Sequence, residues 1–449
     1  MTERPLVSLC VIARDERERI ARCIAAAAPL ADEVVLADTG SRDETPRIAA
    51  EAGARVVAVR WTDDFSAARN ACLDAARGEW ALVVDADETL QPFERTALHQ
   101  LLARAREPAF SVEIASDRGA GRVEVAHVTR LFRIDPRFRY EGRVHEQVLS
   151  SICRALGRET WTPPRSGLRL LHEGYRPELR LARGKLERNR ALLSRDVASR
   201  PSDPGPRFLL ARELTASAGG DVLDVPSVRE ARVVLGPAAQ LLAAAPARGI
   251  TDPALALAAR LALACGDAAD AAHWCARLRE SGESVRWCYA EGERLLALAL
   301  AGGAPATAAA RTFEAAFRAV EGSPAIPAEA EMRGAWAAVR AAAASFLAGD
   351  AARAERTLRA VAAEPVEEAL VRAWLAANAR GPAAAVTELG EAIRAEAGDP
   401  RPWYALSRVF EQLGDSPRAR QMLETALRAA PGWAAASTVP ASGLVAFWQ

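Results

Sequence analysis

The sequence contains almost no lysine and has no surplus of charge of either sign. Lys185 is the only lysine among 449 residues, so arginine supplies nearly all the positive charge, and the formal net charge is +0. A chain without a basic surplus does not attract nucleic acid or an anionic membrane surface in bulk. We therefore expect no nucleic-acid partner, and we interpret the abundance of arginine and alanine as genomic composition bias.

The sequence also lacks paired cysteines and long apolar runs. Its seven cysteines are an odd number, and no two of them have C-x-x-C spacing. This pattern argues against a disulfide framework or a zinc cluster and suits a reducing compartment. No apolar span of 18 residues occurs, and an apolar strand pattern begins almost directly after Met1. We expect no signal peptide and no transmembrane segment, and therefore a cytoplasmic protein.

The glycine-rich phosphate loops of the common nucleotide-binding folds are missing. The first predicted strand is followed by Ala13-Arg14-Asp15-Glu16, and neither G-x-G-x-x-G nor G-x-x-x-x-G-K-[ST] is present. Without glycine the backbone cannot approach a pyrophosphate closely. The sequence thus disfavours a dinucleotide-binding domain, a P-loop enzyme and a sugar-phosphate nucleotidyltransferase.

Strand and helix patterns alternate along the first hundred residues. Strands are predicted at Val7–Ala13, Glu33–Ala37, Arg55–Val59 and Trp80–Val84, with helices at Arg17–Ala28, Asp43–Ala52, Phe65–Arg77 and Pro92–Ala105. This alternation predicts a parallel, doubly wound sheet. Phe110–Ala115 and Val123–Phe132 are then predicted as antiparallel strands joined near Gly119-Ala120-Gly121. A sheet that is parallel first and antiparallel later favours a nucleotide-sugar-binding α/β fold.

The composition changes near residue 180, after which alanine, leucine, arginine and glutamate dominate with helical spacing. The residues at the offsets of a tetratricopeptide unit are Trp403, Leu406, Phe410, Gly414, Ala419, Leu423, Ala426 and Pro431. Weaker copies occur near Gly349 and near Gly266. Because such helix pairs bury their apolar faces only by stacking, we predict an all-α helical-repeat solenoid over residues 191–449, after an α/β domain over residues 1–190.

The most informative feature is the acidic sequence Asp85-Ala86-Asp87-Glu88, which directly follows the apolar run Trp80–Val84. The run is typical of a buried parallel strand, and ligands bind at the carboxyl edge of such sheets. Two carboxylates at i and i+2 can reach one hard cation, and Mg²⁺ or Mn²⁺ usually shares its ligands with substrate phosphates. The pattern favours a metal–diphosphate site; a solvated acidic strand end is the alternative.

Two further positions lie where a nucleotide would bind. Asp38 follows the second strand and can accept hydrogen bonds from a nucleoside, although it could also be a solvated loop carboxylate. Ser41 and Glu44, just after it, have the spacing of a capping box. Arg69 lies at the start of the third helix, where a helix N-terminus and a guanidinium can hold a diphosphate. Pairing of Arg69 with a neighbouring acid is the alternative.

A series of short motifs connects these positions along the chain. In order they are Arg14-Asp15-Glu16, Asp38-Thr39-Gly40-Ser41, Phe65-Ser66 with Arg69-Asn70, Asp85-Ala86-Asp87-Glu88, Arg130-Leu131-Phe132-Arg133, Tyr140-Glu141-Gly142, Val144-His145-Glu146 and His172-Glu173-Gly174-Tyr175. Together they resemble family 2 glycosyltransferases of the GT-A fold over residues 5–190. The resemblance is to the subgroup with lipopolysaccharide-core glucosyltransferases and bacteriocin S-glycosyltransferases, some of which carry tetratricopeptide-like C-termini.

On the donor side, the resemblance implies roles for four residues. Asp38 would contact the uracil or another base, and Arg69 the nucleotide or its diphosphate. Asp85 would contact the ribose or a metal-bound water. Many relatives have Lys-Asn-Glu where this chain has Arg14-Asp15-Glu16, so Asp15 can accept a hydrogen bond from the nucleotide but lacks the amide donor. The implied donor is a nucleoside-diphosphate sugar, with a UDP-sugar favoured.

On the metal and acceptor side, Asp87 would bind a divalent cation, Mg²⁺ or Mn²⁺, with Asp85 and His172 as further metal ligands. His172 is alternatively a diphosphate ligand or a structural histidine. Glu146 or His145 would be the base that takes the acceptor's proton, and His145 could instead orient Glu146. Direct displacement with one base inverts the anomeric centre, as membership of the family also implies.

Two functions from different classes are compatible with these motifs. The first is a metal-dependent inverting glycosyltransferase whose helical array docks a peptide, protein or glycan acceptor. The second is a scaffold or binding protein with a vestigial GT-A domain and a partner-binding solenoid. The intact Asp85 and Asp87 pair favours the enzyme. The array could instead pack on the first domain or form a homodimer.

Overall fold

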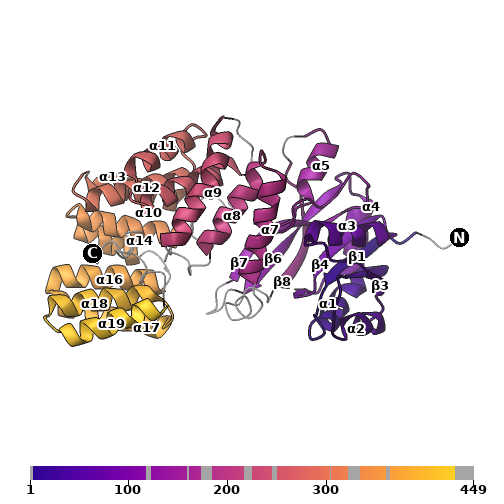
Figure 1. The fold of residues 1–449 in the computed structure, drawn as a ribbon, viewed down its shortest axis with the longest axis horizontal. Coiled ribbons are helices and arrows are strands. Elements are labelled where there is room, and N and C mark those ends of the chain that lie inside the picture. Colours follow the sequence, from indigo (N-terminus) through magenta and orange to yellow (C-terminus); the bar gives the residue numbers. More distant parts are fainter. Residues whose placement is uncertain are drawn as a thin grey trace. The chain divides into compact units, whose positions relative to one another are not determined.

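The structure, a computed structural model, describes residues 4–117, 123–158, 161–172, 185–216, 225–244, 250–303, 305–321, 334–359 and 365–429. The chain divides into two compact units, Met1–Arg200 and Pro201–Gln449. This division lies close to the one predicted at residue 190 from composition. Figure 1 shows the strands gathered in the first unit and helices alone in the described part of the second.

An eight-stranded mixed sheet forms the centre of the N-terminal unit. Its strands are β1 (Val7–Ala13), β2 (Glu33–Asp38), β3 (Arg55–Ala58), β4 (Trp80–Asp85), β5 (Glu88–Leu90), β6 (Ala109–Asp117), β7 (Val123–Arg133) and β8 (Arg165–His172). They lie in the order β3-β2-β1-β4-β7-β6-β8-β5. The first four strands in this order are parallel to one another, and β7 then pairs antiparallel with β4.

The register brings the carboxyl ends of the central strands to one edge. Asp85 of β4 pairs with Ile12 of β1, and Asp38 of β2 pairs with the next residue, Ala13. Each strand is an apolar run because helices cover both faces of this part of the sheet. The acidic residues occur only at the ends of the strands, beyond the part that the helices cover. The motifs after three strands therefore meet along one edge, which is the edge at which open α/β sheets bind ligands.

Helices cover both faces of the sheet. They are α1 (Ile20–Ala27), α2 (Thr45–Glu51), α3 (Phe65–Ala75), α4 (Arg95–Ala103) and α5 (Leu149–Ala155), with a 3₁₀ turn, η1, at Ala28–Leu30. The last helix of the unit is α7 (Lys185–Ser199). Leu9 and Val11 of β1 pack with α1 and α4 in one core, whereas Cys10 packs with α3 and α5 in the other. This alternation is the two-residue period of a strand.

The predicted mixed α/β sheet followed by helical repeats is confirmed. The predicted strands occur within a residue or two of their expected ends, while the helices are shorter than predicted by up to three residues at an end. Three elements were not predicted, namely β5, α5 and β8. β5 is only three residues long, whereas alternate burial along β8, at Ser166, Leu168 and Leu170, is a signal that the sequence pattern carries. The predicted Gly119-Ala120-Gly121 turn lies outside the described residues.

The described part of the second unit consists of helices that pack on their neighbours in the chain. They are α8 (Pro204–Ala216), α9 (Val225–Ala244), α10 (Thr251–Ala264), α11 (Ala268–Arg279), α12 (Val285–Leu300), α13 (Ala306–Glu321), α14 (Gly334–Leu347), α15 (Ala351–Arg359), α16 (Pro365–Arg380), the 3₁₀ turn η3 (Pro382–Ala384), α17 (Ala385–Ala395), α18 (Pro400–Gln412) and α19 (Ser416–Ala429). Sequential neighbours such as α12 and α13, or α18 and α19, lie in contact. This is the organisation of a helical repeat array.

The predicted repeat near the C-terminus coincides with the α18–α19 pair. Gly414 lies between the two helices with φ 78°, a left-handed conformation that glycine adopts without a Cβ clash. The small residues Ala405, Ala419 and Ala426 are buried, so the helices can approach closely. Gly349 and Gly266 occupy the same kind of turn in the α14–α15 and α10–α11 pairs. Pro431 lies outside the described residues.

Within the described ranges, no helix combines the length and the apolar character needed to cross a membrane.

Gly292 of α12 tests how closely the repeat helices are packed. A Cβ at Gly292 would lie 2.7 Å from a ring carbon of Phe313, which is fully buried on α13. We expect Gly292→Ala to lower the free energy of unfolding by about 1–3 kcal/mol through overpacking. Circular dichroism during urea unfolding measures this change. At Gly390 of α17 the nearest atom to an added Cβ is the end of Arg394, 3.7 Å away.

Gly390→Ala is therefore the matched control, and it should leave stability unchanged or raise it by up to about 1 kcal/mol through helix propensity. Equal effects of the two substitutions would contradict close contact between α12 and α13.

Candidate active site

A cluster of charged side chains lies where β4 ends. Asp85 is the last residue of β4, and its carboxylate accepts hydrogen bonds from two arginines. Arg69 Nη2 lies 2.7 Å from Asp85 Oδ1, and Arg130 Nη2 lies 2.8 Å from Asp85 Oδ2. Arg69 also donates from Nε to Glu146 Oε1 at 2.5 Å. The backbone N–H of Asp85 donates to Glu88 Oε2 at 2.8 Å. We call these five residues the arginine–carboxylate cluster.

Three separate elements bring the cluster together. Arg130 belongs to β7 and precedes Leu131, which pairs with Leu82 of β4, so its side chain lies near the end of β4. Arg69 lies about one turn into α3, whose N-terminus is capped by the side chain of Asp64 accepting from the Ala67 N–H at 3.0 Å. The N-terminus of α3 is thus capped from within the chain, and Arg69 alone extends to the cluster.

Burial makes the charges of this cluster costly unless opposite charges pair with them. The side chains of Arg69 and Glu146 are only 7% and 10% exposed, and that of Glu88 is 2% exposed. Burial alone would raise the pKa of Asp85, but Arg130 and Arg69 together hold that pKa far below its usual range. Burial, reinforced by the charge of Asp85, raises the pKa of Glu88 to about 7, although Arg130 opposes this rise. Asp85 therefore stays ionised while its neighbour Glu88 is near its titration point at neutral pH.

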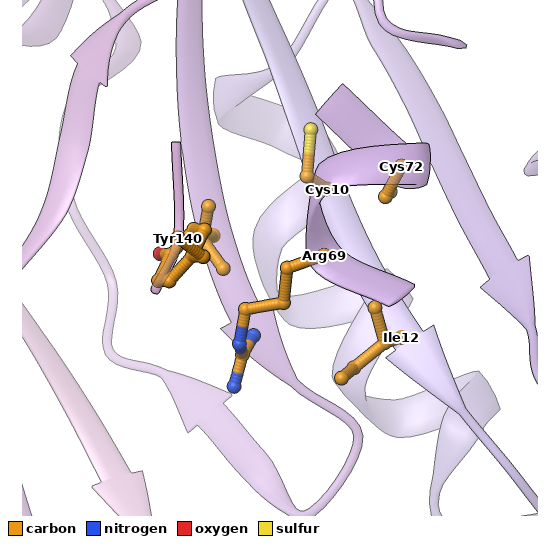
Figure 2. A pocket seen from close by; sticks show the side chains of 6 residues that line it. Cys10, Ile12, Arg69, Cys72 and Tyr140 are labelled. Carbon is orange, nitrogen blue, oxygen red and sulfur yellow. The ribbon is translucent and has the colours of Figure 1, made fainter. Parts of the chain in front are cut away.

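Three buried donor groups in this region have no hydrogen-bond partner among the described residues. They are Arg69 Nη1, Arg130 Nε and the Tyr140 hydroxyl. The Arg69 guanidinium carbon lies 5.3 Å from the centroid of the Tyr140 ring. Figure 2 shows Arg69 leaving α3 between Tyr140 and Ile12, where it lines a small pocket with Cys10, Cys72 and Val83. Buried polar groups without partners are costly, so such groups suit an oxygen-rich ligand that arrives from outside.

Asp87 and His172 form a second pair beside the cluster. His172 Nε2 lies 3.4 Å from Asp87 Oδ1, and each side chain is 15% exposed. Pairing of β5 with β8 produces this proximity, because Glu88 is the register partner of His172. Burial lowers the pKa of His172, but the hydrogen bond and charge of Asp87 outweigh burial and raise it overall. The last residues of the matched motif, Glu173-Gly174-Tyr175, lie outside the described residues.

The donor set of this pair is compatible with a divalent cation. The described residues hold no group of three or more His, Cys, Asp or Glu side chains arranged for a metal. One carboxylate and one imidazole nevertheless suit Mg²⁺ or Mn²⁺ when substrate phosphates complete the coordination. Both oxygens of Asp85 accept from guanidinium groups instead. Metal ligation by Asp85, Asp87 and His172 stays a prediction, and the arrangement suits Asp87 and His172 better.

Asp38, predicted to contact the nucleotide base, and Asp15, predicted to accept a hydrogen bond from the nucleotide, lie together after the ends of β2 and β1. Asp38 accepts from the backbone N–H groups of Gly40 and Ser41 at 3.2 Å, and Asp15 accepts from the Arg42 N–H at 2.7 Å. Asp15 has φ 56°, a conformation that is costly for a residue with a Cβ. Both carboxylates therefore hold the turn after β2, and their contact with a base stays a prediction.

The capping box considered for Ser41 and Glu44 is wrong. α2 begins at Thr45, and the side chain of its N-cap residue, Glu44, makes no capping hydrogen bond. The Ser41 hydroxyl instead accepts from the Asp15 N–H at 3.0 Å, and Asp43 accepts from the Thr45 N–H at 2.9 Å. The spacing of Ser41 and Glu44 fits a capping box, but Ser41 instead bonds to the loop after β1.

The two candidate bases lie on a short loop that a backbone pair closes. Glu141 and Gln147 exchange hydrogen bonds of 3.0 and 3.1 Å. His145 is exposed and has φ 56°, whereas Glu146 turns inward to Arg69. The structure thus places Glu146 in the cluster and His145 outside it. The Glu146 carboxylate is already engaged with Arg69, so the assignment of the base between these two residues stays open.

Comparison with known families agrees with this geometry. Residues 8–155 match the family model for glycosyl transferase family 2. The N-terminal unit carries a family 2 glycosyltransferase domain. This confirms the resemblance drawn from the motifs, and the parallel-then-antiparallel sheet described above is the predicted GT-A architecture. The match covers β1 to α5, so it includes every member of the arginine–carboxylate cluster.

Relatives extend the match beyond the family model. A TPR repeat-containing protein of Synechococcus elongatus is 40% identical over 203 residues, which cover 44% of this chain and 49% of that protein. The SPbeta prophage-derived glycosyltransferase SunS of Bacillus subtilis is 25% identical over 222 residues, covering 47% of this chain and 50% of SunS. The chain thus spans about half the length of the curated relatives it matches.

Solved structures also resemble the chain. One is residues 1–349 of Staphylococcus aureus TarS in complex with UDP. It is 14% identical and covers 62% of this chain and 92% of that one, with a TM-score of 0.37.

Sequence reasoning assigned no role to two residues of this site, Glu88 and Tyr140. Glu88 stands beside the two aspartates, and its apolar neighbour Leu90 indicates that the chain turns back into the core there. Tyr140 lies in a motif, but nothing local indicates that its hydroxyl would be buried beside Arg69. Arg130 was noted only as the first residue of the motif Arg130-Leu131-Phe132-Arg133. For Glu88 and Arg130 the signal is the register of the sheet, which pairs β5 with β8 and β7 with β4. Tyr140 instead lies outside the strands, where its backbone exchanges hydrogen bonds with the Asn70 side chain of α3.

Arg69 provides a direct test of the cluster. Arg69→Gln removes the charge between Asp85 and Glu146, so two carboxylates would face each other with only Arg130 nearby. Breaking a buried ion pair from one side costs about 3–5 kcal/mol, and we expect a loss of this size in the free energy of unfolding, measured by urea titration. Arg47→Gln is the control, because Arg47 pairs with Glu44 and Glu51 on an exposed helix surface.

The control should change stability by less than about 0.5 kcal/mol. A loss of similar size in both variants would show that the cluster does not depend on Arg69.

Proposed function

We propose that this chain transfers a sugar from a nucleoside-diphosphate sugar to an acceptor, with inversion at the anomeric carbon. The observation that carries the proposal is the buried arginine–carboxylate cluster at the carboxyl edge of a parallel sheet, inside the region that matches family 2 glycosyltransferases. Its buried donors without partners have the chemistry that a diphosphate requires. Because the chain spans only about half of its curated relatives, activity and substrates belong to this proposal.

Departure of the nucleoside diphosphate builds negative charge on the leaving group. Arg69 and Arg130 each carry a buried nitrogen without a partner among the described residues, and these nitrogens would donate to phosphate oxygens once the donor binds. Donors fixed before the reaction stabilise developing charge without reorganisation. Asp85 supports both guanidinium groups by holding them in place. A UDP-sugar is the favoured donor, with Asp38 and Asp15 beside the base.

Asp87 and His172 would hold a divalent cation, Mg²⁺ or Mn²⁺, next to the diphosphate. When bound, such a cation supplies Lewis-acid neutralisation of the leaving group. The chain's own contribution is to keep one carboxylate and one imidazole within 3.4 Å of each other. Asp85 remains engaged with its arginines, so it would contact the ribose or a metal-bound water rather than replace Asp87.

The acceptor must lose a proton as it attacks. Glu146 can take that proton if its carboxylate lies within hydrogen-bond reach of the acceptor. His145, exposed on the same loop, is the other candidate. We propose a peptide, protein or glycan as acceptor, because a helical array presents an extended surface suited to such chains. Transfer to sulfur, oxygen or nitrogen is compatible with one base in this position.

Asp87→Asn tests the proposed metal site. This substitution preserves the side-chain shape but removes the negative charge that a hard cation requires. We expect donor hydrolysis and transfer to fall to background, at unchanged folding. The donor is first chosen by thermal shift from a panel of nucleotide sugars, since binding at a hundredfold excess over Kd adds about 2.7 kcal/mol of stability.

Asp74→Asn is the control, because Asp74 is 60% exposed and its ion pair with Arg139 lies at the surface. It should keep full activity. Activity of the wild type that persists unchanged in excess EDTA would contradict metal dependence. Absence of any donor turnover by the wild type would instead favour the scaffold alternative.

A pair of substitutions decides between the two candidate bases. Glu146→Gln keeps the shape of the side chain but removes the proton acceptor. If Glu146 is the base, kcat should fall by roughly 10²–10⁴ with little change in donor affinity, because the loss concerns only proton transfer. Steady-state kinetics and calorimetry with UDP measure the two quantities. The same pattern in His145→Ala, and not in Glu146→Gln, would assign the base to His145.

A further inference from the structure

Asp196, on the last helix of the N-terminal unit, is a buried carboxylate that no motif identified. It lies on α7 and is 5% exposed. Its Oδ2 accepts from the backbone N–H of Arg143 at 3.0 Å and from Arg200 Nη2 at 2.8 Å. Its Oδ1 lies 3.4 Å from Arg143 Nε. A carboxylate is buried only when hydrogen bonds and opposite charges compensate its loss of water, and here Arg143 provides both.

Arg143 lies at the tip of the loop that carries the candidate bases. The loop runs from Glu141 to Gln147, and its backbone is held at the tip from both sides. The Arg143 N–H donates to Asp196, and the Arg143 carbonyl accepts from the N–H of Phe65, the first residue of α3, at 2.9 Å. The loop is therefore clamped between α7 and the helix that carries Arg69.

The backbone conformation of this loop is not one that its residues favour by themselves. Gly142 has φ 99°, and His145 has φ 56°, although it is not a glycine. A non-glycine residue in the left-handed region persists only where its surroundings determine it. Two residues separate Arg143 from Glu146, whose carboxylate must reach Arg69 Nε at 2.5 Å. A shift of Arg143 would therefore carry both His145 and Glu146 with it.

We propose that Asp196 is a positioning residue for the proposed transfer reaction: it fixes Arg143 and thereby holds Glu146 and His145 in the geometry that proton transfer requires. This inference rests on the proposed function and deepens it. Asp196 touches neither donor nor acceptor in this role. Its effect passes through the backbone of the loop, and misplacement by about 1 Å can cost roughly a hundredfold in rate.

Two substitutions at Asp196 and one neighbouring control test the proposal. Asp196→Ala removes the acceptor for the Arg143 N–H, whereas Asp196→Asn keeps an oxygen that can still accept it but loses the charge. Arg195→Gln, one residue earlier on α7, breaks only the surface ion pair of Arg195 with Asp63, whose side chains are 57% and 47% exposed. All three are made in the full chain.

The first readout separates kcat from donor affinity. With the donor that the wild type hydrolyses, we expect kcat to fall roughly a hundredfold in Asp196→Ala and less in Asp196→Asn. UDP affinity in the presence of Mn²⁺ should stay within about twofold, and Arg195→Gln should match the wild type. Rates are divided by the number of UDP sites found by calorimetry, so misfolded protein does not count. Unchanged kcat per site in both Asp196 variants would overturn the proposal.

The second readout needs no turnover. The chain has 5 histidines, so histidine ring signals in an isotope-labelled NMR spectrum are few, and His145→Gln assigns the signal of His145. We expect that signal to shift or broaden in Asp196→Ala and to remain in place in Arg195→Gln. An unmoved His145 signal overturns the proposal. If the wild type turns over no donor, the proposed function fails, and the His145 signal alone then decides whether Asp196 positions the loop.

Discussion

Asp85 stays ionised at the carboxyl edge of the sheet, where its side chain is 27% exposed, because two guanidinium groups accompany it. The elements around it hold those two groups in place. The carboxylate has Arg69 on one oxygen and Arg130 on the other. A buried charge is tolerated only when its partners are held in register. One arginine comes from a helix and the other from an antiparallel strand, so the cluster forms only when α3, β4 and β7 are all in place. The same interactions that stabilise the fold thus pre-organise the site.

The cluster extends in two directions that correspond to the two halves of the proposed reaction. Toward the donor, Asp85 is followed by Asp87, which lies 3.4 Å from His172 because β5 pairs with β8. Toward the acceptor, Arg69 holds Glu146, whose loop is clamped by Asp196 of α7. Arg69 is therefore shared between both halves.

The helical array is held together by a different kind of interaction. Its helices are rich in alanine, and the turn glycines between successive helices adopt left-handed conformations, as at Gly349 and Gly414. Each pair buries its apolar surface against its neighbours, so the array forms from local contacts repeated along the chain. Its pattern was accordingly visible in the sequence. The α18–α19 pair was recognised from spacing alone, because helix pairing depends on residues close in the chain.

The sequence by itself determined the alternation of the first four strands with their helices, the change from parallel to antiparallel strands, the helical array and the acidic motif at the end of β4. These depend on periodicity, turn residues and short motifs, all of which act over a few residues. Only the tertiary structure decided that Arg69 and Arg130 share Asp85, that Glu146 pairs with Arg69, and that Asp196 holds Arg143. Those contacts join residues 16 to 77 positions apart. Strand register and helix packing determine these contacts. Neither can be read from a short pattern in a single sequence.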